Sequence, residues 1–417
     1  MDAKQDTERE STLPGPDFEL YAPDVNVYPW PILKQIQEHD AIFWSNKRQS
    51  WLITRHEDVK DGFADRRLSV DRVSRLFNHL TDAEREEFWP VLHYMPKWSV
   101  FADAPYHTKV RRMLISAFRL EVVERLRPFV EDAVEELLDD IERQKEVDFN
   151  PAFAFKLPAL VIMKMLEIPR DRYNDFQRWS VNLSNLIVEP RPKAGTMAKA
   201  TKVILEMNEC FREIIVERRK NMGDDFLSTL INSVDKADDC GEDELLGSCQ
   251  LVMLAGHETT THMLGNGMLE LIRNPEQRDV LLQDPGLIKK AVEELVRYNG
   301  VVGAFARTAL ENFDWRDKKV SAGDTVLLFV YAANRDPRVY ENPEELDFTR
   351  DNPFPLSFGP GIHFCFGNQI ARLELEVAYN AILRRFDKIE IMDKELDWSR
   401  NFILRGLDKL SLRFHSR

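Results

Sequence analysis

The sequence is poor in cysteine: only Cys210, Cys240, Cys249 and Cys365 are spread over its 417 residues. So few thiols in so long a chain do not make a disulfide framework. A reducing, intracellular setting fits, and we expect a cytoplasmic protein. Positive charge is also in deficit, because 57 lysines and arginines face 71 aspartates and glutamates, for a net charge of −14. This balance argues against nucleic acid as the main partner.

Long hydrophobic runs are missing as well. Residues 1–16 are polar and charged, without the apolar segment of a signal peptide, so we expect no membrane anchor. The apolar stretch 157–168 is short and contains Lys164, which favours a core helix over a membrane span. The chain also lacks a P-loop, a G-x-G-x-x-G motif and internal repeats, and no second redox domain is evident.

Hydrophobic residues make up 43% of the chain, which is ample for a large core. We expect residues 1–24 to form a loosely ordered leader and residues 25–417 a single domain. Apolar periodicity predicts a mainly helical chain with short β segments. The expected elements are a helix over 29–39, a hairpin of 41–44 with 51–54, a short helix at 58–65, a long functional loop at 66–100, helices through 106–220 with a break at 189–195 that fits a helix hairpin or a mobile lid, a long helix at 243–274, a helix over 285–298, and β segments at 325–331 and 401–414.

A glycine-punctuated loop at 357–368 presents one cysteine just before a helix, which is predicted by apolar residues at helical spacing over 371–382. The N–H groups at a helix N-terminus favour a thiolate at Cys365. Gly361 and Gly367 allow unusual backbone angles and the close approach of a flat ligand. A lone thiolate suits an axial iron ligand better than a zinc site. A buried structural cysteine explains the same residue types about equally well.

Five residues of this loop share the spacing of a known signature: Phe358, Gly361, His363, Cys365 and Gly367. Through them the chain resembles the cytochrome P450 family, in its soluble, bacterial type. The resemblance implies that the cofactor is haem b, iron protoporphyrin IX. It also implies that Cys365 is the proximal iron ligand and that the other four residues help to bind the cofactor.

The resemblance extends over roughly residues 40–414. It implies the cytochrome P450 fold, mainly α (α+β), in which a large helical part with a long central helix joins a smaller β-containing part near the N-terminus. Haem is then expected between the helix 243–274, on the distal side, and the Cys365 loop, on the proximal side.

The middle of the long helix reads Ala255-Gly256-His257-Glu258-Thr259. Glycine and threonine are poor mid-helix residues, and the Thr259 hydroxyl can bond back to the Ala255 carbonyl and open a local distortion. Close packing of small residues explains the stretch by itself. The segment also matches the family's Ala-Gly-x-Asp/Glu-Thr motif. The match implies that Ala255 and Gly256 line the oxygen groove. It further implies that Glu258 and Thr259 relay protons.

A zinc-protease site is excluded in the same helix. Its two histidines must be four residues apart to share a helix face, whereas His257 and His262 are five apart. We therefore expect both to be surface or packing histidines.

Glu294 and Arg297 are neighbours on the next expected helix. They match the family's Glu-x-x-Arg element. The resemblance implies that they form a buried structural triad with Arg350 and that this triad fixes the loop carrying Cys365.

The two propionates of haem need cationic or hydrogen-bond donor partners. His107 and Arg111 are four residues apart on one expected helix face. The family uses such a pair for the propionates, and the resemblance adds Arg307 and His363 to the set. In one departure, Pro355 replaces a histidine that is common before the haem loop.

Apolar residues at the family's substrate-contact segments predict an apolar pocket, although each of them fits a plain core position equally well. No charged anchor is evident among them, so we expect an apolar small-molecule substrate. The residues are Met95, Val100, Leu251, Leu254, Val302, Gly303, Ile403 and Leu404.

The chain carries no flavin or iron–sulfur domain, so separate electron donors are required. The resemblance implies a ferredoxin with its NAD(P)H-dependent reductase. Because ferredoxins are typically acidic, we hypothesise that Lys109 and Arg112 form a positive docking patch, the alternative being ordinary solvated charges.

The resemblance implies a monooxygenase that inserts one atom of O₂ into its substrate by hydroxylation or epoxidation. Three alternatives stay open: a biosynthetic oxidase that performs C–C coupling or desaturation, a peroxygenase, and a non-catalytic haem-thiolate sensor. The presence of both Glu258 and Thr259 argues against the last two, since neither needs this proton relay.

Overall fold

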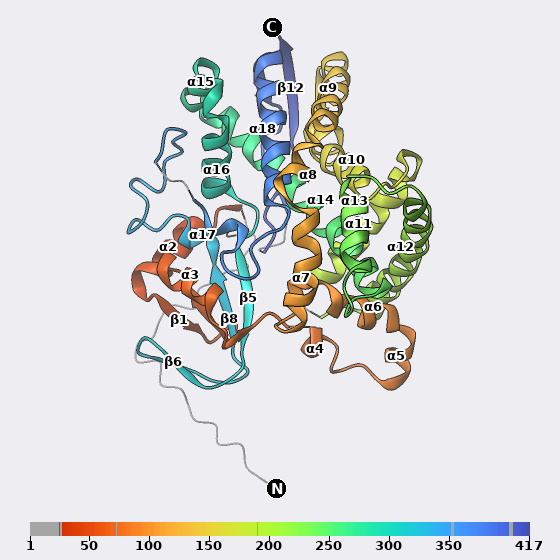
Figure 1. The fold of residues 1–417 in the computed structure, drawn as a ribbon. Helices are drawn as coiled ribbons and strands as arrows, with labels where there is room; N and C mark the ends of the chain where they lie inside the picture. The colour runs from red at the N-terminus through yellow and green to blue at the C-terminus, as the bar shows by residue number, and fades with distance from the viewer. Residues whose placement is uncertain (1–24, 26, 72, 190, 352–353, 400–402) are drawn as a thin grey trace.

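The computed structural model describes the whole chain except residues 1–24, 26, 72, 190, 352–353 and 400–402. The expected leader over 1–24 lies outside the described residues. The mainly α fold with a smaller sheet-containing part is confirmed (Figure 1). The longer helices are α2 (Trp30–His39), α3 (His56–Ala64), α7 (Tyr106–Ala117), α9 (Arg127–Gln144), α10 (Lys156–Met165), α11 (Tyr173–Val188), α12 (Ala194–Lys220), α13 (Phe226–Asp235), α14 (Glu242–Arg273), α15 (Pro275–Gln283), α16 (Ile288–Asn299) and α18 (Asn368–Arg385).

The main sheet assembles strands from distant parts of the chain in the order β1-β2-β8-β5-β3. The expected hairpin is confirmed, since Ile42 pairs with Ile53 and Ser45 with Ser50. Strand β2 runs parallel to β8, and the other pairs are antiparallel. The strands are β1 (Ile42–Ser45), β2 (Ser50–Ile53), β3 (Leu68–Ser69), β5 (Ala304–Ala309) and β8 (Thr325–Phe329).

A helix packs on each face of this sheet. Alternate residues of a strand point to opposite sides, so the residues of β2 divide between two core clusters. Trp51 and Ile53 of β2 belong to a core cluster with Val59 of α3. Leu52 lies between them in sequence and packs in a different cluster, with Leu33 of α2. Helices α2 and α3 therefore sandwich the sheet, at the lower left of Figure 1.

Three smaller sheets complete the β structure. One joins β4, β12 and β9, and two are hairpin-like pairs, β6 with β7 and β10 with β11. The expected C-terminal strand structure is confirmed over 407–416. The bounds are β4 (Glu146–Asp148), β6 (Phe313–Trp315), β7 (Lys318–Val320), β9 (Phe386–Ile391), β10 (Asp397–Trp398), β11 (Leu407–Lys409) and β12 (Ser411–Ser416).

Helix α14 is the centre of the helical part. Its 32 residues begin with three acidic side chains, which suit the positive end of the helix dipole. It contacts α10, α11, α12, α13, α16 and α18. On the α18 side the approach is close, because Gly267 leaves room for the Tyr379 hydroxyl, which donates to the Met263 carbonyl at 2.9 Å. No helix in the described part of the chain is long and apolar enough to cross a membrane.

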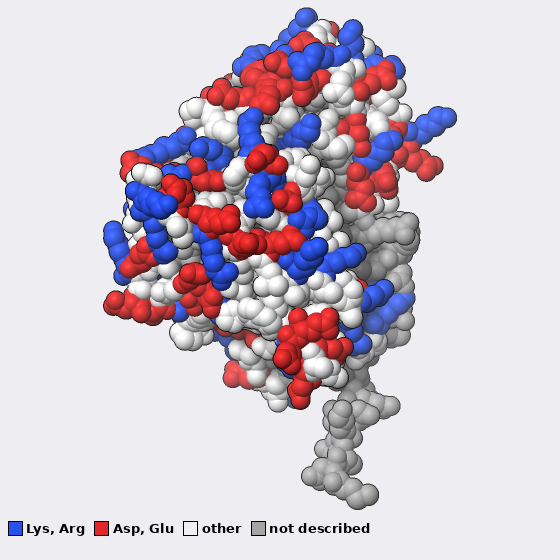
Figure 2. All heavy atoms as spheres, turned by 90° about the vertical axis from the view of Figure 1, so that its right-hand side faces the viewer, with Lys and Arg blue, Asp and Glu red and all other residues white. Residues whose placement is uncertain are grey.

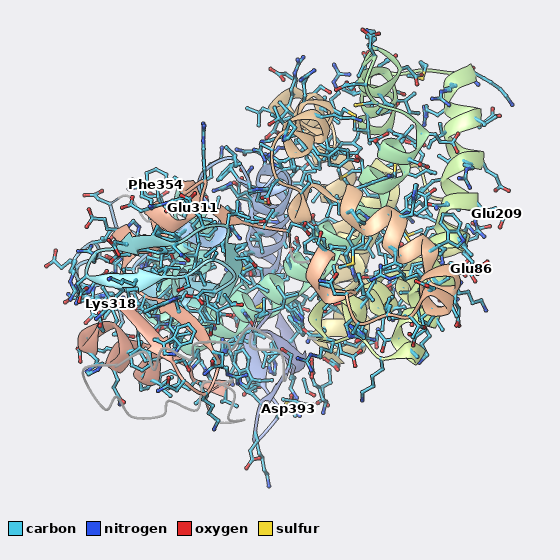
Figure 3. The ribbon with its side chains drawn as sticks, turned by 90° about the horizontal axis from the view of Figure 1, so that it is seen from below. Glu86, Glu209, Glu311, Lys318, Phe354 and Asp393 are labelled. Carbon is cyan, nitrogen blue, oxygen red and sulfur yellow. The ribbon has the colours of Figure 1, made fainter. Side chains whose placement is uncertain are left out.

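The sheet-containing and helical parts lie on opposite sides of the molecule. Seen from below, Lys318 and Glu311 mark the sheet-containing side, and Glu86 and Glu209 mark the helical side (Figure 3). The expected break in the helices is confirmed, since α11 ends at Val188 and α12 begins at Ala194.

The prediction of one long loop over 66–100 is wrong, because most of this segment has regular secondary structure. Besides β3 the segment contains short helices, and α5 begins with a capping box in which Thr81 and Glu84 bond each other's backbone N–H. Short helices of four to six residues show too little apolar periodicity to be seen in the sequence. They are α4 (Val73–Leu76), α5 (Asp82–Glu87) and α6 (Trp89–Tyr94), and elsewhere in the chain α8 (Leu120–Glu124) and α17 (Val330–Ala333).

Candidate active site

A cavity of about 340 Å³ lies between α14 and the loop that precedes α18. Its walls are mostly apolar, as in typical small-molecule sites. Many of the residues singled out in the sequence share it: Val100, His107, Arg111, Leu251, Ala255, Gly256, Thr259, Val302, Phe358, His363, Cys365 and Gly367.

The Cys365 loop is held by its own backbone. The Cys365 N–H donates to the Phe358 carbonyl at 2.9 Å, and the Phe364 N–H donates to the Gly361 carbonyl at 3.1 Å. Gly361 has a φ of +92°, a conformation that a side chain would strain. The loop thereby places Cys365 three residues before Asn368, the first residue of α18.

The helix N-terminus has less effect on the Cys365 thiol than the sequence indicated. Burial raises the pKa of Cys365, while the backbone N–H groups of Gly367 and Asn368 and the nearby Arg372 and Arg111 act in the opposite direction. Burial dominates, so the loop alone does not favour the thiolate.

Gly367 differs from the sequence prediction. Its φ is −76°, an ordinary value, so no special backbone angle explains it. A Cβ at Gly367 would meet no atom within 4 Å, and the residue lines the cavity. The glycine therefore keeps space open for a ligand rather than permitting a turn.

Three of the four potential propionate partners, His107, Arg111 and His363, line this cavity, and the fourth, Arg307, lines a neighbouring one. His107 and His363 lie with ring centroids 4.0 Å apart. Burial, followed by the nearby His107, Arg307 and Arg111, lowers the pKa of His363 to about 3. Within the described residues the buried Nε2 of His107 has no hydrogen-bond partner.

This arrangement fits haem. Two carboxylates would accept hydrogen bonds from the cationic and imidazole donors here, including the unpartnered Nε2 of His107, and would offset the repulsion between these donors. The Cys365 thiol lines the same cavity. Arg111 also holds the loop, because both terminal nitrogens donate to the Phe364 carbonyl at 3.1 Å and its guanidinium lies 4.4 Å from the Phe366 ring centroid.

On the α14 wall, the Thr259 hydroxyl donates to the Ala255 carbonyl at 2.8 Å, as the sequence predicted. Thr260 and Thr261 make the same bond one turn back, at 3.1 and 3.0 Å. The helix nevertheless stays α-helical over its whole length. Gly256 has a packing reason as well, since a Cβ there would lie 2.6 Å from Ile162 of α10.

Glu258 is largely enclosed. The Ser184 hydroxyl of α11 donates to its Oε2, and its Oε1 lies 3.9 Å from Nε2 of His262. Burial raises the pKa of Glu258; the Ser184 bond opposes this shift and the nearby Asp408 adds to it. Burial therefore makes the carboxyl easier to protonate than a glutamate in water, which suits a group that takes up and releases a proton.

His257 and His262 are packing residues, as expected, but both are inside the protein. His257 bonds Ser180 Oγ at 2.8 Å and the Phe155 carbonyl at 3.2 Å. Burial lowers the pKa of each histidine to about 4.

The predicted triad comes together. Arg297 donates to Glu294 through Nε at 2.7 Å and Nη2 at 2.8 Å, and Arg350 donates to the same carboxylate through Nε at 3.1 Å. Arg297 Nη1 also reaches the Asn334 carbonyl at 2.9 Å. Asn334 in turn donates to the Ser357 hydroxyl at 2.8 Å, at the start of the Cys365 loop.

A second cavity of about 220 Å³ adjoins the first, and it contains most of the predicted substrate pocket. The prediction that Met95 lines the pocket is wrong, because Met95 lies on neither cavity and is 1% exposed in the hydrophobic core. Gly303 is not on the walls either, and its backbone instead bonds Ile403 and Tyr331. The predicted residues that line the second cavity are Val100, Leu251, Leu254, Val302, Ile403 and Leu404.

Sequence reasoning missed the contribution of α11, which brings Ser184, Ile187 and Val188 to the second cavity. A usable signal existed, since Ser180 and Ser184 interrupt the apolar face of this helix one turn apart. Glu374 of α18 was also missed. It lines the first cavity, is 1% exposed, and neither carboxyl oxygen has a partner among the described residues.

The hypothesised positive patch is weaker than expected. Lys109 pairs with Glu244 of α14 at 3.3 Å and is only 22% exposed, so its charge is offset. Arg112 is exposed on α7. Basic and acidic side chains are also interspersed over the face seen in Figure 2.

The comparisons with known proteins agree with this geometry. The model of the family described as Cytochrome P450 matches residues 68–404. The chain is 37% identical over 379 residues to Cytochrome P450 107B1 of Saccharopolyspora erythraea, covering 88% of this chain and 90% of the relative. It is 32% identical over 405 residues to Polyketide biosynthesis cytochrome P450 PksS of Bacillus subtilis, covering 94% and 97%. The solved PksS structure matches with a TM-score of 0.85 and 31% identity, over 95% of this chain and 100% of that one.

Proposed function

Since this chain belongs to the cytochrome P450 family of haem b monooxygenases, we propose that it inserts one atom of O₂ into an apolar small molecule, by hydroxylation or epoxidation. We propose a ferredoxin with an NAD(P)H-dependent reductase as the electron donor. One observation carries the proposal. The cavity lined by Cys365 is also lined by Thr259, and it shares lining residues with a mostly apolar second cavity that Glu258 lines.

In this proposal Cys365 binds the haem iron, and His107, Arg111, Arg307 and His363 bind the propionates. The bound haem supplies the activation of dioxygen, and a thiolate ligand favours cleavage of the O–O bond. The open space beside Gly367 admits the flat macrocycle.

The distal wall delivers protons. The Glu258 carboxyl, whose pKa burial raises, can take up and release a proton beside the second cavity, and the Thr259 hydroxyl, which lines both cavities, can pass one on. Ala255 and Gly256 add no bulk to this wall. Proton transfer by a positioned side chain typically contributes about 10²–10⁴-fold to rate.

The triad keeps the ligand loop in place. Glu294, Arg297 and Arg350 fix the segment that reaches Ser357, and Ser357 also donates to the Val296 carbonyl of α16 at 3.1 Å. We propose that residues 25–417 form one domain built around this site.

The substrate class follows from the apolar walls and from the relatives. PksS is named for polyketide biosynthesis. A polyketide-like or terpenoid compound, mostly hydrocarbon with few polar groups, matches cavities whose walls are mostly apolar.

A test combines binding and turnover. The purified ferric holoprotein is titrated with apolar compounds, and a shift of its Soret band toward high spin reports a bound substrate. Turnover with a surrogate ferredoxin, its reductase and isotopically labelled O₂ is expected to place one labelled atom in the product. An unlabelled product with a new C–C or C=C bond would instead identify the biosynthetic oxidase, and turnover with H₂O₂ alone the peroxygenase.

Thr259→Ala tests the proton relay. We expect product formation per electron pair to fall on the order of 100-fold, with the electrons diverted to peroxide, while substrate still shifts the Soret band. Thr261→Ala is the matched control, because it removes the same type of back-bond from the same helix at a residue that lines neither cavity. Equal coupling in both variants would contradict the assigned role.

A further inference from the structure

The two cavities share one wall, but they differ at their ends. Cys365 lines only the first cavity, and Ser184 lines only the second. Ser184 therefore faces the cavity that the thiol does not line. The shared residues are Val100, Leu251, Ala255, Thr259, Val302 and Phe305.

Ser184 has its only donor committed. Its hydroxyl, 7% exposed, donates to Glu258 Oε2. A hydroxyl group offers one donor and two acceptor lone pairs, so Ser184 Oγ can still accept a hydrogen bond from the cavity but cannot donate one.

The surroundings of Ser184 are apolar. Ile187 and Val188 flank it on α11, and Leu254 faces the same cavity from α14. The other polar side chains that line this cavity are Glu258, Thr259 and Arg307. Of these, Glu258 is held by Ser184 itself, while Thr259 and Arg307 have the roles proposed above, toward the haem.

We propose that Ser184 is a specificity-determining residue that accepts a hydrogen bond from a substrate alcohol. The inference rests on the proposed function and names its substrate class: an apolar molecule that carries an O–H group at the end remote from the carbon to be oxidised. A ketone at the same place has no proton to offer, and its oxygen would face an acceptor. A hydrocarbon gains nothing there.

The same bond links substrate to the acid. An alcohol that donates to Ser184 polarises the hydroxyl that donates to Glu258, since hydrogen bonds in a chain strengthen one another. A bound substrate of the right class thereby tightens the hold on the Glu258 carboxyl.

The test uses three ligands with one carbon skeleton: cyclododecanol, cyclododecanone and cyclododecane. Each is titrated into the ferric holoprotein, with the Soret shift as the readout. A single net hydrogen bond predicts that wild type binds the alcohol about three- to tenfold more tightly than the ketone or the alkane.

Variants isolate the residue. Ser184→Ala is expected to bring the alcohol-to-ketone preference to about one, and Ser184→Thr, which keeps the hydroxyl, is expected to retain it. Asn185→Ala, at the next and exposed position of α11, should leave the preference unchanged. Equal affinities for the three ligands in wild type, failure of the alcohol to bind, or a preference that survives Ser184→Ala overturns the proposal. The reduced CO spectrum, recorded on the same samples, separates this failure from loss of the thiolate-ligated haem, which would overturn the proposed function itself.

Discussion

The buried Glu294 carboxylate offers the sharpest stability prediction. It is 0% exposed and accepts hydrogen bonds from Arg297, Arg350 and the Asp347 N–H, the last at 3.0 Å. Glu294→Gln keeps the shape of the side chain and removes its charge. Arg297, at 1% exposure, then stays charged without its counter-ion.

Breaking a buried ion pair from one side typically costs about 3–5 kcal/mol. Arg297 keeps three carbonyl partners, Asn334, Pro343 and Glu345, which places the expected cost near the lower end, about 3 kcal/mol. Such a loss changes the ratio of folded to unfolded protein by more than about a hundredfold.

Urea unfolding followed by far-UV circular dichroism measures the cost, and the reduced CO spectrum measures how much Cys365 ligation survives. Glu217→Gln is the matched control, because its pair with Lys220 is 66% and 63% exposed and should contribute only about 0–1 kcal/mol. If Glu294→Gln unfolds within about 0.5 kcal/mol of wild type, which is within the range of neutral surface changes, the triad does not fix the loop.

Two further predictions concern the long helix. Burial lowers the pKa of His257 and of His262 to about 4, below the value of about 6.5 in an unfolded chain, so the unfolded state binds protons first as the pH falls. The stability of the fold with both histidines neutral is therefore fully present above about pH 6.5, and it falls by up to ~3 kcal/mol for each histidine as the pH falls toward 4. The midpoints of urea unfolding at pH 7 and pH 5 should differ less in His262→Asn than in wild type. An unchanged difference would refute the assignment. Gly267→Ala would put a Cβ 2.0 Å from the Tyr379 hydroxyl, and calorimetry should show a loss of about 1–3 kcal/mol, whereas Gly195→Ala, with no atom within 4 Å, should not destabilise the protein.

The parts of the site that the sequence predicted are those encoded by short local spacing. The Cys365 loop, the Ala255–Thr259 segment and the Glu294–Arg297 pair are each contained within a few residues of one loop or helix. Local spacing of this kind survives folding, because neighbours on one element keep their relative positions.

The features that the sequence did not predict depend on contacts between elements that are far apart in the chain. The pairing of Lys109 with Glu244 joins α7 to α14, and no local pattern indicates it. Met95 was predicted to line the pocket because it lies in a segment that matches a substrate-contact segment of the family, but only the packing of the segment shows that Met95 faces the core. Ser184 of α11 bonds Glu258 of α14; the serines at 180 and 184 could have marked a polar position on the helix, but no local pattern indicates which residue it meets.

The most direct test of the account is the absorption spectrum of the reduced CO complex in wild type, Cys365→Ala and Cys210→Ala. Cys210 is a buried core thiol on α12 and serves as the control. The account predicts the red-shifted Soret band of a thiolate-ligated haem in wild type and Cys210→Ala and its loss in Cys365→Ala. A band that persists in Cys365→Ala, or that is absent from wild type, would contradict Cys365 as the iron ligand.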